Sequence, residues 1–393
     1  MSPVAEVAAV FLRLGCISFG GPVAHLGYFR TELVERRGWI DDARFSDLVA
    51  LCQFLPGPAS SQLVFALGKH RAGLGGALVA SLCFTLPSAL LMIAFAFGVS
   101  TAGDLRGAGW IHGLKLAAVG VVAQAVLGMA KNLSAGRARM VMTVLSATAI
   151  LGLPGALTQV AVIFSGGLAG FFLYRDRVAA PAALPEESPP RGHVIAALAL
   201  ALFAALLVVL PGLARATGVR TVAVFDSFYR AGSLVFGGGH VVLPLLRAEV
   251  VPPGWVSDDV FLAGYGAAQA IPGPLFTFSA YLGASMTSGP PALAMGLLCL
   301  SGIFLPAWLL IGGALPFWHT IRTKRWAQAA LTGANAAVVG VLLAALYDPV
   351  ITESVRGPAD AAAALLAFAA LHFGKVPPWG VVLGMAGVGV ILP

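Results

Sequence analysis

The chain has 393 residues, of which 59% are hydrophobic and only 10% are charged, and its mean hydropathy is +0.90. Soluble domains average about 25% charged residues, so this composition excludes an ordinary soluble protein. The net charge of +7 fits the basic cytoplasmic loops of a membrane protein, and no cluster of basic and aromatic residues indicates nucleic acid as a partner.

Apolar stretches of about 20 residues recur along the chain, and each is long enough to cross a lipid bilayer as a helix. They predict an all-α polytopic membrane protein with about 13 helical segments. The first two segments of each half are expected to be either full crossings or re-entrant hairpins. In chain order the predicted segments are 4–30, 43–68, 76–99, 110–130, 138–153, 156–174, 193–213, 222–250, 257–284, 291–318, 327–347, 358–374 and 378–392.

The chain contains an internal repeat. Shifting residues 11–32 by 217 positions gives nine identities in 22, and shifting residues 38–58 by 216 positions gives eight identities in 21. Further along, an offset of 220 pairs residues 113–121 with 333–341. We call residues related by these offsets repeat mates. One unit used twice at this length is typical of transporters.

Matching loops of the two halves differ in charge. KHR at 69–71 matches the uncharged MTSG at 286–289, and other basic loops also face acidic or neutral counterparts. Short basic loops stay in the cytoplasm, so the two repeats are predicted to lie in the bilayer with inverted topology. We assign 1–174 to the first repeat, 175–221 to a polar connector and a linker helix, and 222–393 to the second, inverted repeat. The N-terminus is then cytoplasmic, and the C-terminus is periplasmic or extracellular.

Glycine and proline interrupt the apolar segments at matching points of both repeats. In a helix interior Gly costs about 1 kcal/mol and Pro about 3 kcal/mol, so paired breaks need a reason. One interpretation is a tolerated kink or a tight helix contact. The other, which four paired breaks favour, is a discontinuous helix whose free N–H groups bind an anion near the midplane. The candidate substrate-binding residues are then Gly20, Gly21, Pro22, Pro56, Gly57, Pro58, Gly237, Gly238, Gly239, Pro272, Gly273 and Pro274.

Charged residues near the breaks are further candidates. Arg30 and Arg247 follow the breaks and lean back toward them, so they are either anion ligands or partners in loop-end salt bridges. Glu32 and Glu249 are either partners of nearby arginines or carriers of a coupling proton. Lys115 lies in an apolar stretch, where it either snorkels to the interface or supplies a fixed cation for a dianion.

Uncharged polar residues complete the candidate site. Gln53 and Gln269 are repeat mates three residues before PGP and can donate hydrogen bonds to an oxyanion. Asn335 is the repeat mate of Lys115, which indicates an asymmetric site. His25 and His240 follow the breaks without being mates, and each is either a satisfied core histidine or a proton-handling group.

Enzyme chemistry is not expected. The sequence has no Walker A, HExxH, GxSxG or dinucleotide-binding motif. The four cysteines lie in apolar segments and form no CxxC pair, which favours small buried residues over metal or redox use. No metal site and no cofactor are therefore expected.

The motif set resembles that of a known family. FGGPVAHLG (19–27), FLPGP (54–58), FGGGHVVLP (236–244) and GANAAVVG (333–340) make the chain similar to the chromate ion transporter family, over nearly its whole length and in the two-domain form. The resemblance implies an inner-membrane protein that exports chromate, driven by the proton motive force, and confers chromate resistance. The family's motifs fall on the Gly and Pro residues of the four breaks, on His240 and on Asn335, whereas Lys115 departs from the matching Asn.

We therefore expect a secondary active transporter that exports chromate across the bacterial inner membrane, coupled to protons or to anion exchange. Chromate and sulfate are both tetrahedral dianions, and nothing in the sequence distinguishes them. A sulfate or other oxyanion transporter or channel is the alternative, and a membrane-embedded enzyme is a third hypothesis. Base rates of twofold assembly suggest a homodimer.

Overall fold

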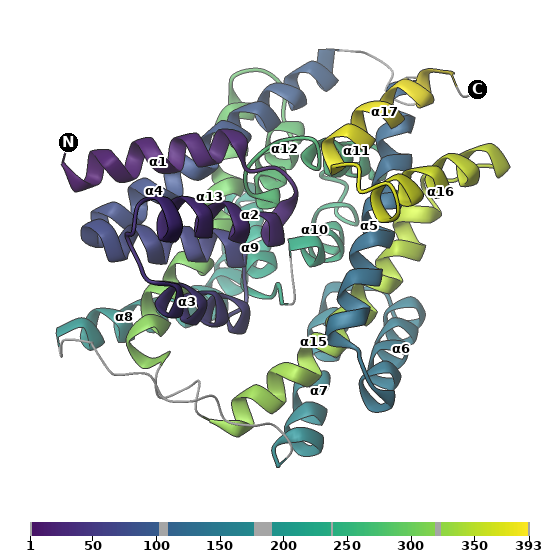
Figure 1. The fold of residues 1–393 in the computed structure, drawn as a ribbon. Coiled ribbons are helices and arrows are strands. Elements are labelled where there is room, and N and C mark those ends of the chain that lie inside the picture. Colours follow the sequence, from purple (N-terminus) through teal and green to yellow (C-terminus); the bar gives the residue numbers. More distant parts are fainter. Residues whose placement is uncertain (1, 102–108, 177–190, 237–238, 319–323, 392–393) are drawn as a thin grey trace.

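The computed structural model describes residues 2–101, 109–176, 191–236, 239–318 and 324–391. Within these ranges the chain is helical and has no β-strand, as predicted (Figure 1). The first repeat contains α1 (Pro3–Ile17), α2 (Gly21–Phe29), α3 (Asp42–Phe54), α4 (Ala59–Thr101), α5 (Gly109–Leu133), α6 (Arg137–Gly152) and α7 (Ala156–Tyr174). After α8 (Arg191–Thr217), the second repeat contains α9 (Arg220–Ser233), α10 (Val242–Val250), α11 (Asp258–Ala268), α12 (Phe278–Ser285), α13 (Pro291–Ala314), α15 (Arg325–Ala345), α16 (Pro358–His372) and α17 (Pro378–Ile391).

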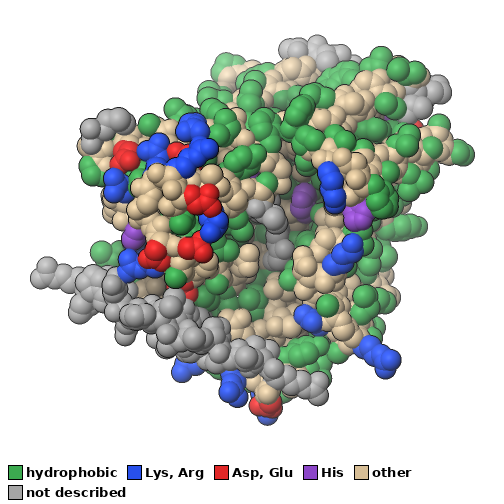
Figure 2. All heavy atoms as spheres, in the orientation of Figure 1, with side chains coloured by type: hydrophobic (Ala, Val, Ile, Leu, Met, Phe, Trp, Pro, Cys, Tyr) green, Lys and Arg blue, Asp and Glu red, His purple; other side chains and the backbone are tan. Residues whose placement is uncertain are grey.

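Six stretches of the described chain are helical, long and apolar enough to cross a membrane. They comprise α4, α5, α7, α8, α13 with the turn after it, and α15 with the turn after it. The window of highest hydropathy in α8 has a mean of 2.9 and is only 11% buried, which suits a helix that faces lipid. Figure 2 shows hydrophobic side chains over much of the surface, whereas charged side chains of both signs gather over α1 to α3. The protein is a multi-pass membrane protein.

The segments before the spanning helices are short and broken. α1 has 15 residues and therefore rises about 22 Å, less than the roughly 30 Å of a hydrocarbon core. It ends where Gly20 and Gly21 adopt the left-handed φ values of +95° and +75°, which a helix of L-residues does not accommodate. The break predicted at FGGP is therefore present, and its second half-helix consists of the nine residues of α2 and a π-helical continuation over Arg30–Arg36.

α4 is a helical hairpin. Its backbone leaves helical geometry at Ala72 and Gly73, the point between the predicted segments 43–68 and 76–99. A Cβ placed on Gly68 would lie 2.5 Å from the carbonyl oxygen of Gly76, so the two arms touch just beyond the turn. The first arm is short, and the second arm is the spanning part.

Matching side chains and backbone groups begin matching helices. The Asp41 carboxylate accepts a hydrogen bond from the Arg44 N–H at the start of α3. The hydroxyl of Ser257, the repeat mate of Asp41, accepts one from the Val260 N–H at the start of α11. Both residues satisfy donors that a helix leaves free at its first turn.

The long helices of each repeat pack against the other repeat. α5 lies against α16 and α17, and α15 lies against α6 and α7. A Cβ on Gly113 would lie 2.0 Å from the carbonyl oxygen of Met385, and one on Gly333 would lie 2.0 Å from that of Gly166. Gly113 and Gly333 are repeat mates, so the same kind of close backbone contact locks each repeat to the other.

Candidate functional site

The two PGP loops bind across the repeats. The Gly57 N–H donates to the carbonyl of Val235, 2.6 Å away, at the end of α9. The Gly273 N–H donates to the carbonyl of Ser18, 2.8 Å away, at the end of α1. Because Gly57 and Gly273 are mates and Ser18 and Val235 are mates, each loop holds the helix break of the other repeat in the same way.

A cavity of about 470 Å³, which we call cavity 1, lies beside the first of these loops. It is lined by Gly20, Gly57 and Gly239 of the breaks and by Cys52 and Ala125. The lining also contains five side chains that can donate or accept hydrogen bonds, namely Gln53, Ser60, Asn132, His240 and Asn335.

A second cavity of about 160 Å³, cavity 2, lies beside the other loop. Its lining includes Ala268, Gln269, Ile271, Gly273 and Leu275. Their repeat mates Cys52, Gln53, Leu55, Gly57 and Ala59 all line cavity 1. The two cavities therefore occupy corresponding places in the two repeats, and they share the lining residues Gly20, Ala125 and His240.

His240 stands where the two cavities meet. Its Nδ1 lies 2.7 Å from the hydroxyl of Tyr265, which is fully buried. Among the described residues, this hydroxyl has no other hydrogen-bond partner, and a buried O–H needs an acceptor. Tyr265 therefore donates to Nδ1, and the proton of the neutral imidazole lies on Nε2.

The lining of both cavities offers donors without formal charge. No Asp, Glu, Lys or Arg lines cavity 1 or cavity 2 in the described parts of the chain. Two lining amides have a buried polar atom with no partner among the described residues, Nε2 of Gln269 and Oδ1 of Asn335. Such atoms are costly when unpaired, so they point to a polar molecule that enters the cavities.

The arginines proposed as anion ligands lie elsewhere. Arg30 Nε donates to Asp42 at 2.7 Å, and Arg247 Nε donates to Asp258 at 2.7 Å. The two pairs are repeat mates, and neither arginine lines cavity 1 or cavity 2. In this conformation both form the loop-end salt bridges that the sequence left as the alternative, and contact with an anion stays a prediction.

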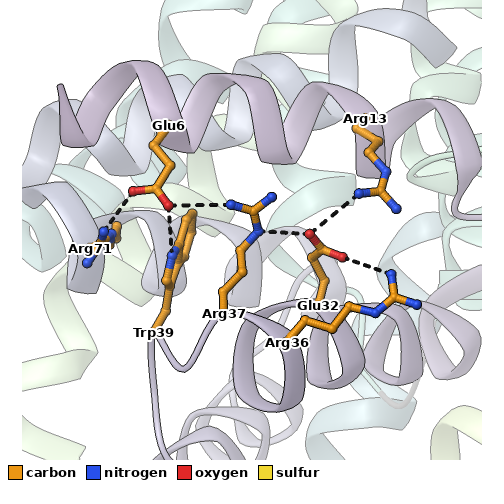
Figure 3. Close-up of polar contacts among 7 residues, drawn as sticks. All are labelled: Glu6, Arg13, Glu32, Arg36, Arg37, Trp39 and Arg71. Carbon is orange, nitrogen blue, oxygen red and sulfur yellow. Dashed lines mark hydrogen bonds and ion pairs between the residues drawn. The ribbon is translucent and has the colours of Figure 1, made fainter. Parts of the chain in front are cut away.

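Glu32 is the centre of an arginine cluster (Figure 3). It accepts a hydrogen bond from Arg37 at 2.8 Å and lies 3.6 Å from Arg13 and 3.4 Å from Arg36. Burial acts to raise the pKa of Glu32, but the hydrogen bond from Arg37 and the neighbouring charges hold that pKa below its usual value. Its mate Glu249 is bound through both oxygens by Arg230, the mate of Arg13, at 2.9 Å. Proton coupling by either glutamate stays untested.

Two other candidates are buried away from both cavities. Lys115 is 2% exposed, and its Nζ donates to Asp259 at 2.7 Å. His25 is fully buried, and its Nε2 lies 3.1 Å from the Ser18 carbonyl. This carbonyl also accepts the N–H of Gly273, so His25 supports the crossing of a PGP loop and a helix break.

Glycines and prolines of the breaks complete the predicted site, and some polar residues of the site were not predicted from the sequence. Gly237 and Gly238 lie outside the described residues, and Pro22 lies in the first turn of α2. Pro56, Pro58, Pro272 and Pro274 flank the glycines of the PGP loops. Gln124, which lines cavity 2, Asn132, which lines cavity 1, and Tyr265, the partner of His240, were not predicted. Gln124 was visible as a polar residue inside an apolar segment, and Tyr265 precedes Gln269 by four residues, on the same helix face.

Known proteins resemble the chain over most of its length. It is 29% identical to the chromate transport protein of Pseudomonas aeruginosa over 90% of this chain and 82% of that protein. It is 29% identical to the chromate transport protein of Cupriavidus metallidurans over 98% of this chain and 92% of that protein. A probable chromate transport protein of Synechococcus elongatus is 26% identical over 87% of this chain and 83% of its own length. No solved structure matches the chain significantly.

The sequence profile of the family described as chromate transporter matches the chain twice, over residues 5–171 and 222–390. Together the two matches cover most of the sequence, in agreement with the motifs at the helix breaks. The chain therefore belongs to the chromate transporter family.

Proposed function

We propose that the protein exports chromate, a tetrahedral dianion, from the cytoplasm across the bacterial inner membrane. Family membership and the names of its relatives support a transporter of this anion. The export direction, coupling to protons or to a counter-anion, a cytoplasmic N-terminus and a periplasmic C-terminus are parts of this proposal. They rest on the family resemblance and on the distribution of loop charges in the sequence.

One observation carries the proposal. Cavities 1 and 2 meet between the two repeats and are lined by the glycines of the breaks, two glutamine mates and a histidine donor, with no charged side chain among their described lining residues. Half-helices begin at these breaks, so their free N–H groups add partial positive charge. Such neutral donors bind a tetrahedral oxyanion through several hydrogen bonds and also release it, as transport requires.

The unequal sizes of the two cavities support alternating access. Cavity 1 has about 470 Å³ and cavity 2 about 160 Å³, although corresponding residues line them. Inverted repeats that hold two different conformations produce one open side and one closed side. Exchange of the two conformations would then close cavity 1 and open cavity 2. Exposure of the site alternates, while the anion stays between the breaks.

Transport in reconstituted vesicles tests the proposal. We expect an imposed proton gradient, or an anion on the opposite side, to drive chromate uptake faster than in protein-free vesicles. If neither chromate nor sulfate moves under any gradient, the proposal is wrong. Flux that is independent of the proton gradient and of counter-anions would instead assign a channel, and flux of sulfate alone would assign a sulfate transporter.

Three further expectations belong to the same proposal. Coupling protons are carried by Glu32, Glu249 or His25. A neutral substitution of the residue that carries the proton should uncouple chromate flux from the proton gradient. The described residues contain no group of three or more His, Cys, Asp or Glu side chains that could hold a metal ion. We expect the purified protein to carry no cofactor, and a bound cofactor would favour the membrane-embedded enzyme instead. A homodimer should appear as twice the chain mass of 40.2 kDa in detergent.

A further inference from the structure

Lys115 and Asp259 form an ion pair that joins the two repeats. Lys115 on α5 is 2% exposed, and its Nζ lies 2.7 Å from Oδ1 of Asp259 on α11. The Asp259 side chain is 27% exposed, and it lines a third cavity of about 390 Å³, cavity 3. The pair therefore has a buried cationic end and an acidic end that faces a hollow.

The pair has no counterpart in the other half of the molecule. The repeat mate of Lys115 is Asn335, and the position that matches Asp259 is occupied by Ala43. Asn335 lines cavity 1, whereas Lys115 does not line cavity 2. At this position of the repeat, the second half thus has an asparagine that lines cavity 1, and the first half has a lysine that binds the carboxylate of Asp259.

α11 extends from cavity 3 to cavity 2. Asp258 and Asp259 at its start line cavity 3, and Ala268 at its end lines cavity 2. Between them, a Cβ on Gly266 would lie 2.4 Å from the carbonyl oxygen of Leu114, so α5 and α11 touch without space for solvent. This contact lies on α11 between the residues that line cavity 3 and those that line cavity 2, and the Lys115–Asp259 pair joins the same two helices at the cavity 3 end.

We propose that Lys115 is a substrate-binding cation that Asp259 holds in this conformation and that passes to the anion in the opposite one. The inference rests on the proposed function. When the repeats exchange conformations, cavity 2 takes the form that cavity 1 has here. Lys115 then takes the place relative to cavity 2 that Asn335 has relative to cavity 1. The dianion meets only neutral donors on one side and an ammonium group on the other.

The change of partner at Lys115 couples the opening of cavity 2 to binding of the substrate. A buried ammonium group without a partner is costly, so Lys115 leaves Asp259 only when another anion replaces the carboxylate. A tetrahedral dianion in cavity 2 is such a replacement, because charge-assisted hydrogen bonds to its oxygens are strong. Asp259 keeps its place in the lining of cavity 3.

Two cysteine reporters at mated positions test whether Asp259 holds cavity 2 closed. Cys52 lines cavity 1, and its mate Ala268 lines cavity 2, so Cys52 and Ala268→Cys report on the two sides in variants that lack Cys16, Cys83 and Cys299. A membrane-impermeant thiol reagent is applied to each membrane face separately. Asp259→Asn should raise labelling of Ala268→Cys about five-fold or more and lower that of Cys52. Loss of the ion pair should shift the population from the conformation with cavity 1 open to the one with cavity 2 open, and such couplings typically change an equilibrium about five-fold or more.

The control is Asp360→Asn. It breaks the buried pair between Asp360 and His112, which also joins α5 to the second repeat at 2.7 Å but lines none of the three cavities. We expect this control to leave both reporters as in the parent. Labelling in Asp259→Asn that equals the control would overturn the proposal. If Asp259→Asn fails to reach the membrane, Lys115→Gln replaces it in the same measurement.

Chromate affinity measured from each face tests the contact with the anion. Lys115→Gln should raise the half-saturating chromate concentration at least about ten-fold on the face that opens through cavity 3, since hydrogen bonds to charged groups are strong. On the cavity 1 face the change should stay below about two-fold. Equal effects on both faces, or none, would remove Lys115 from the substrate path. If the parent moves no chromate, the proposed function fails, and the reporters still decide whether the pair holds cavity 2 closed.

Discussion

The two repeats are alike in what holds them together and unlike in what faces the cavities. Gly57 and Gly273 each donate to a carbonyl of the opposite repeat, and in both the Arg30–Asp42 and Arg247–Asp258 pairs the arginine Nε lies 2.7 Å from the aspartate Oδ1. We call these matching contacts the frame, because each repeat holds the other through the same kind of contact. A transporter that works from both sides needs such a frame, because each half must be able to adopt the conformation of the other.

The cavity walls differ between the repeats. Ser60 lines cavity 1, while its mate Phe276 is a buried aromatic residue. His240 serves both cavities, while its mate is Val23. Asn335 lines cavity 1, while its mate Lys115 binds Asp259. Under the proposed function, these differences predict that the anion binds differently in cavity 1 and in cavity 2. The following variants distinguish the contacts that join the repeats from the residues that line the cavities.

The largest effect is expected from the frame. Gly333→Leu places a side chain where even a Cβ would lie 2.0 Å from the carbonyl oxygen of Gly166, so α7 and α15 must separate at a cost of about 3 kcal/mol or more. Gly113→Leu should do the same at the mated contact. Both should fail to give monodisperse protein in detergent. Gly384→Leu on α17, which has open space around it, should behave as the parent, and equal yields of all three would contradict the frame.

The next largest effect concerns cavity 2. Gly21 lines it, and an added Cβ there would meet nothing within 4 Å, although the φ of +75° adds some strain. Gly21→Leu should therefore yield folded protein that no longer transports chromate, because the new side chain enters the cavity. Gly27→Leu on the same helix also has open space and is the control. Normal chromate flux by Gly21→Leu would place the anion path elsewhere.

A smaller effect is expected from the glutamine mates. Gln269 lines cavity 2, and its buried Nε2 has no hydrogen-bond partner among the described residues, while Gln53 lines cavity 1. Replacing either by Ala removes a hydrogen bond from an uncharged amide to the charged anion, worth about 1.5 kcal/mol, so the half-saturating chromate concentration should rise about ten-fold. Gln328→Ala, outside both cavities, should change nothing. Unaltered affinity in both mates would exclude these amides as ligands.

The smallest effect separates the two glutamates. The pKa of Glu32 is held below its usual value by Arg37 and the neighbouring arginines, so Glu32→Gln should lower the free energy of unfolding by about 1 kcal/mol at neutral pH. Glu249→Gln should cost less, because burial raises the pKa of Glu249 against its pairing with Arg230, and Arg230 keeps Asp226 as a partner at 3.0 Å. Thermal unfolding in detergent measures both. The lowered pKa of Glu32 means that its contribution is present above its ordinary pKa of 4.5 and is lost as the pH falls below that value. An equal loss in both variants at neutral pH would contradict this difference.

The sequence was informative where the signal is local or repeated. The breaks at Gly20 and Gly57, the turn between the two arms of α4 and the asymmetry at Lys115 all follow from glycine, proline and the repeat offsets. Partners across the repeats were not predictable, because nothing local to Lys115 indicates Asp259, 144 residues away. The pairing of α5 with α17 is hidden for the same reason, since it depends on how two separate units interlock.

The most direct test of the central claim is a structure of the protein with a bound tetrahedral oxyanion, such as chromate or molybdate. The claim is that neutral donors from both repeats hold the anion where cavities 1 and 2 meet. We predict an anomalous peak within hydrogen-bond distance of His240 Nε2 and of the Gln53 or Gln269 amide. A peak beside Arg30 or Arg247, with both cavities free of anion, would contradict the account.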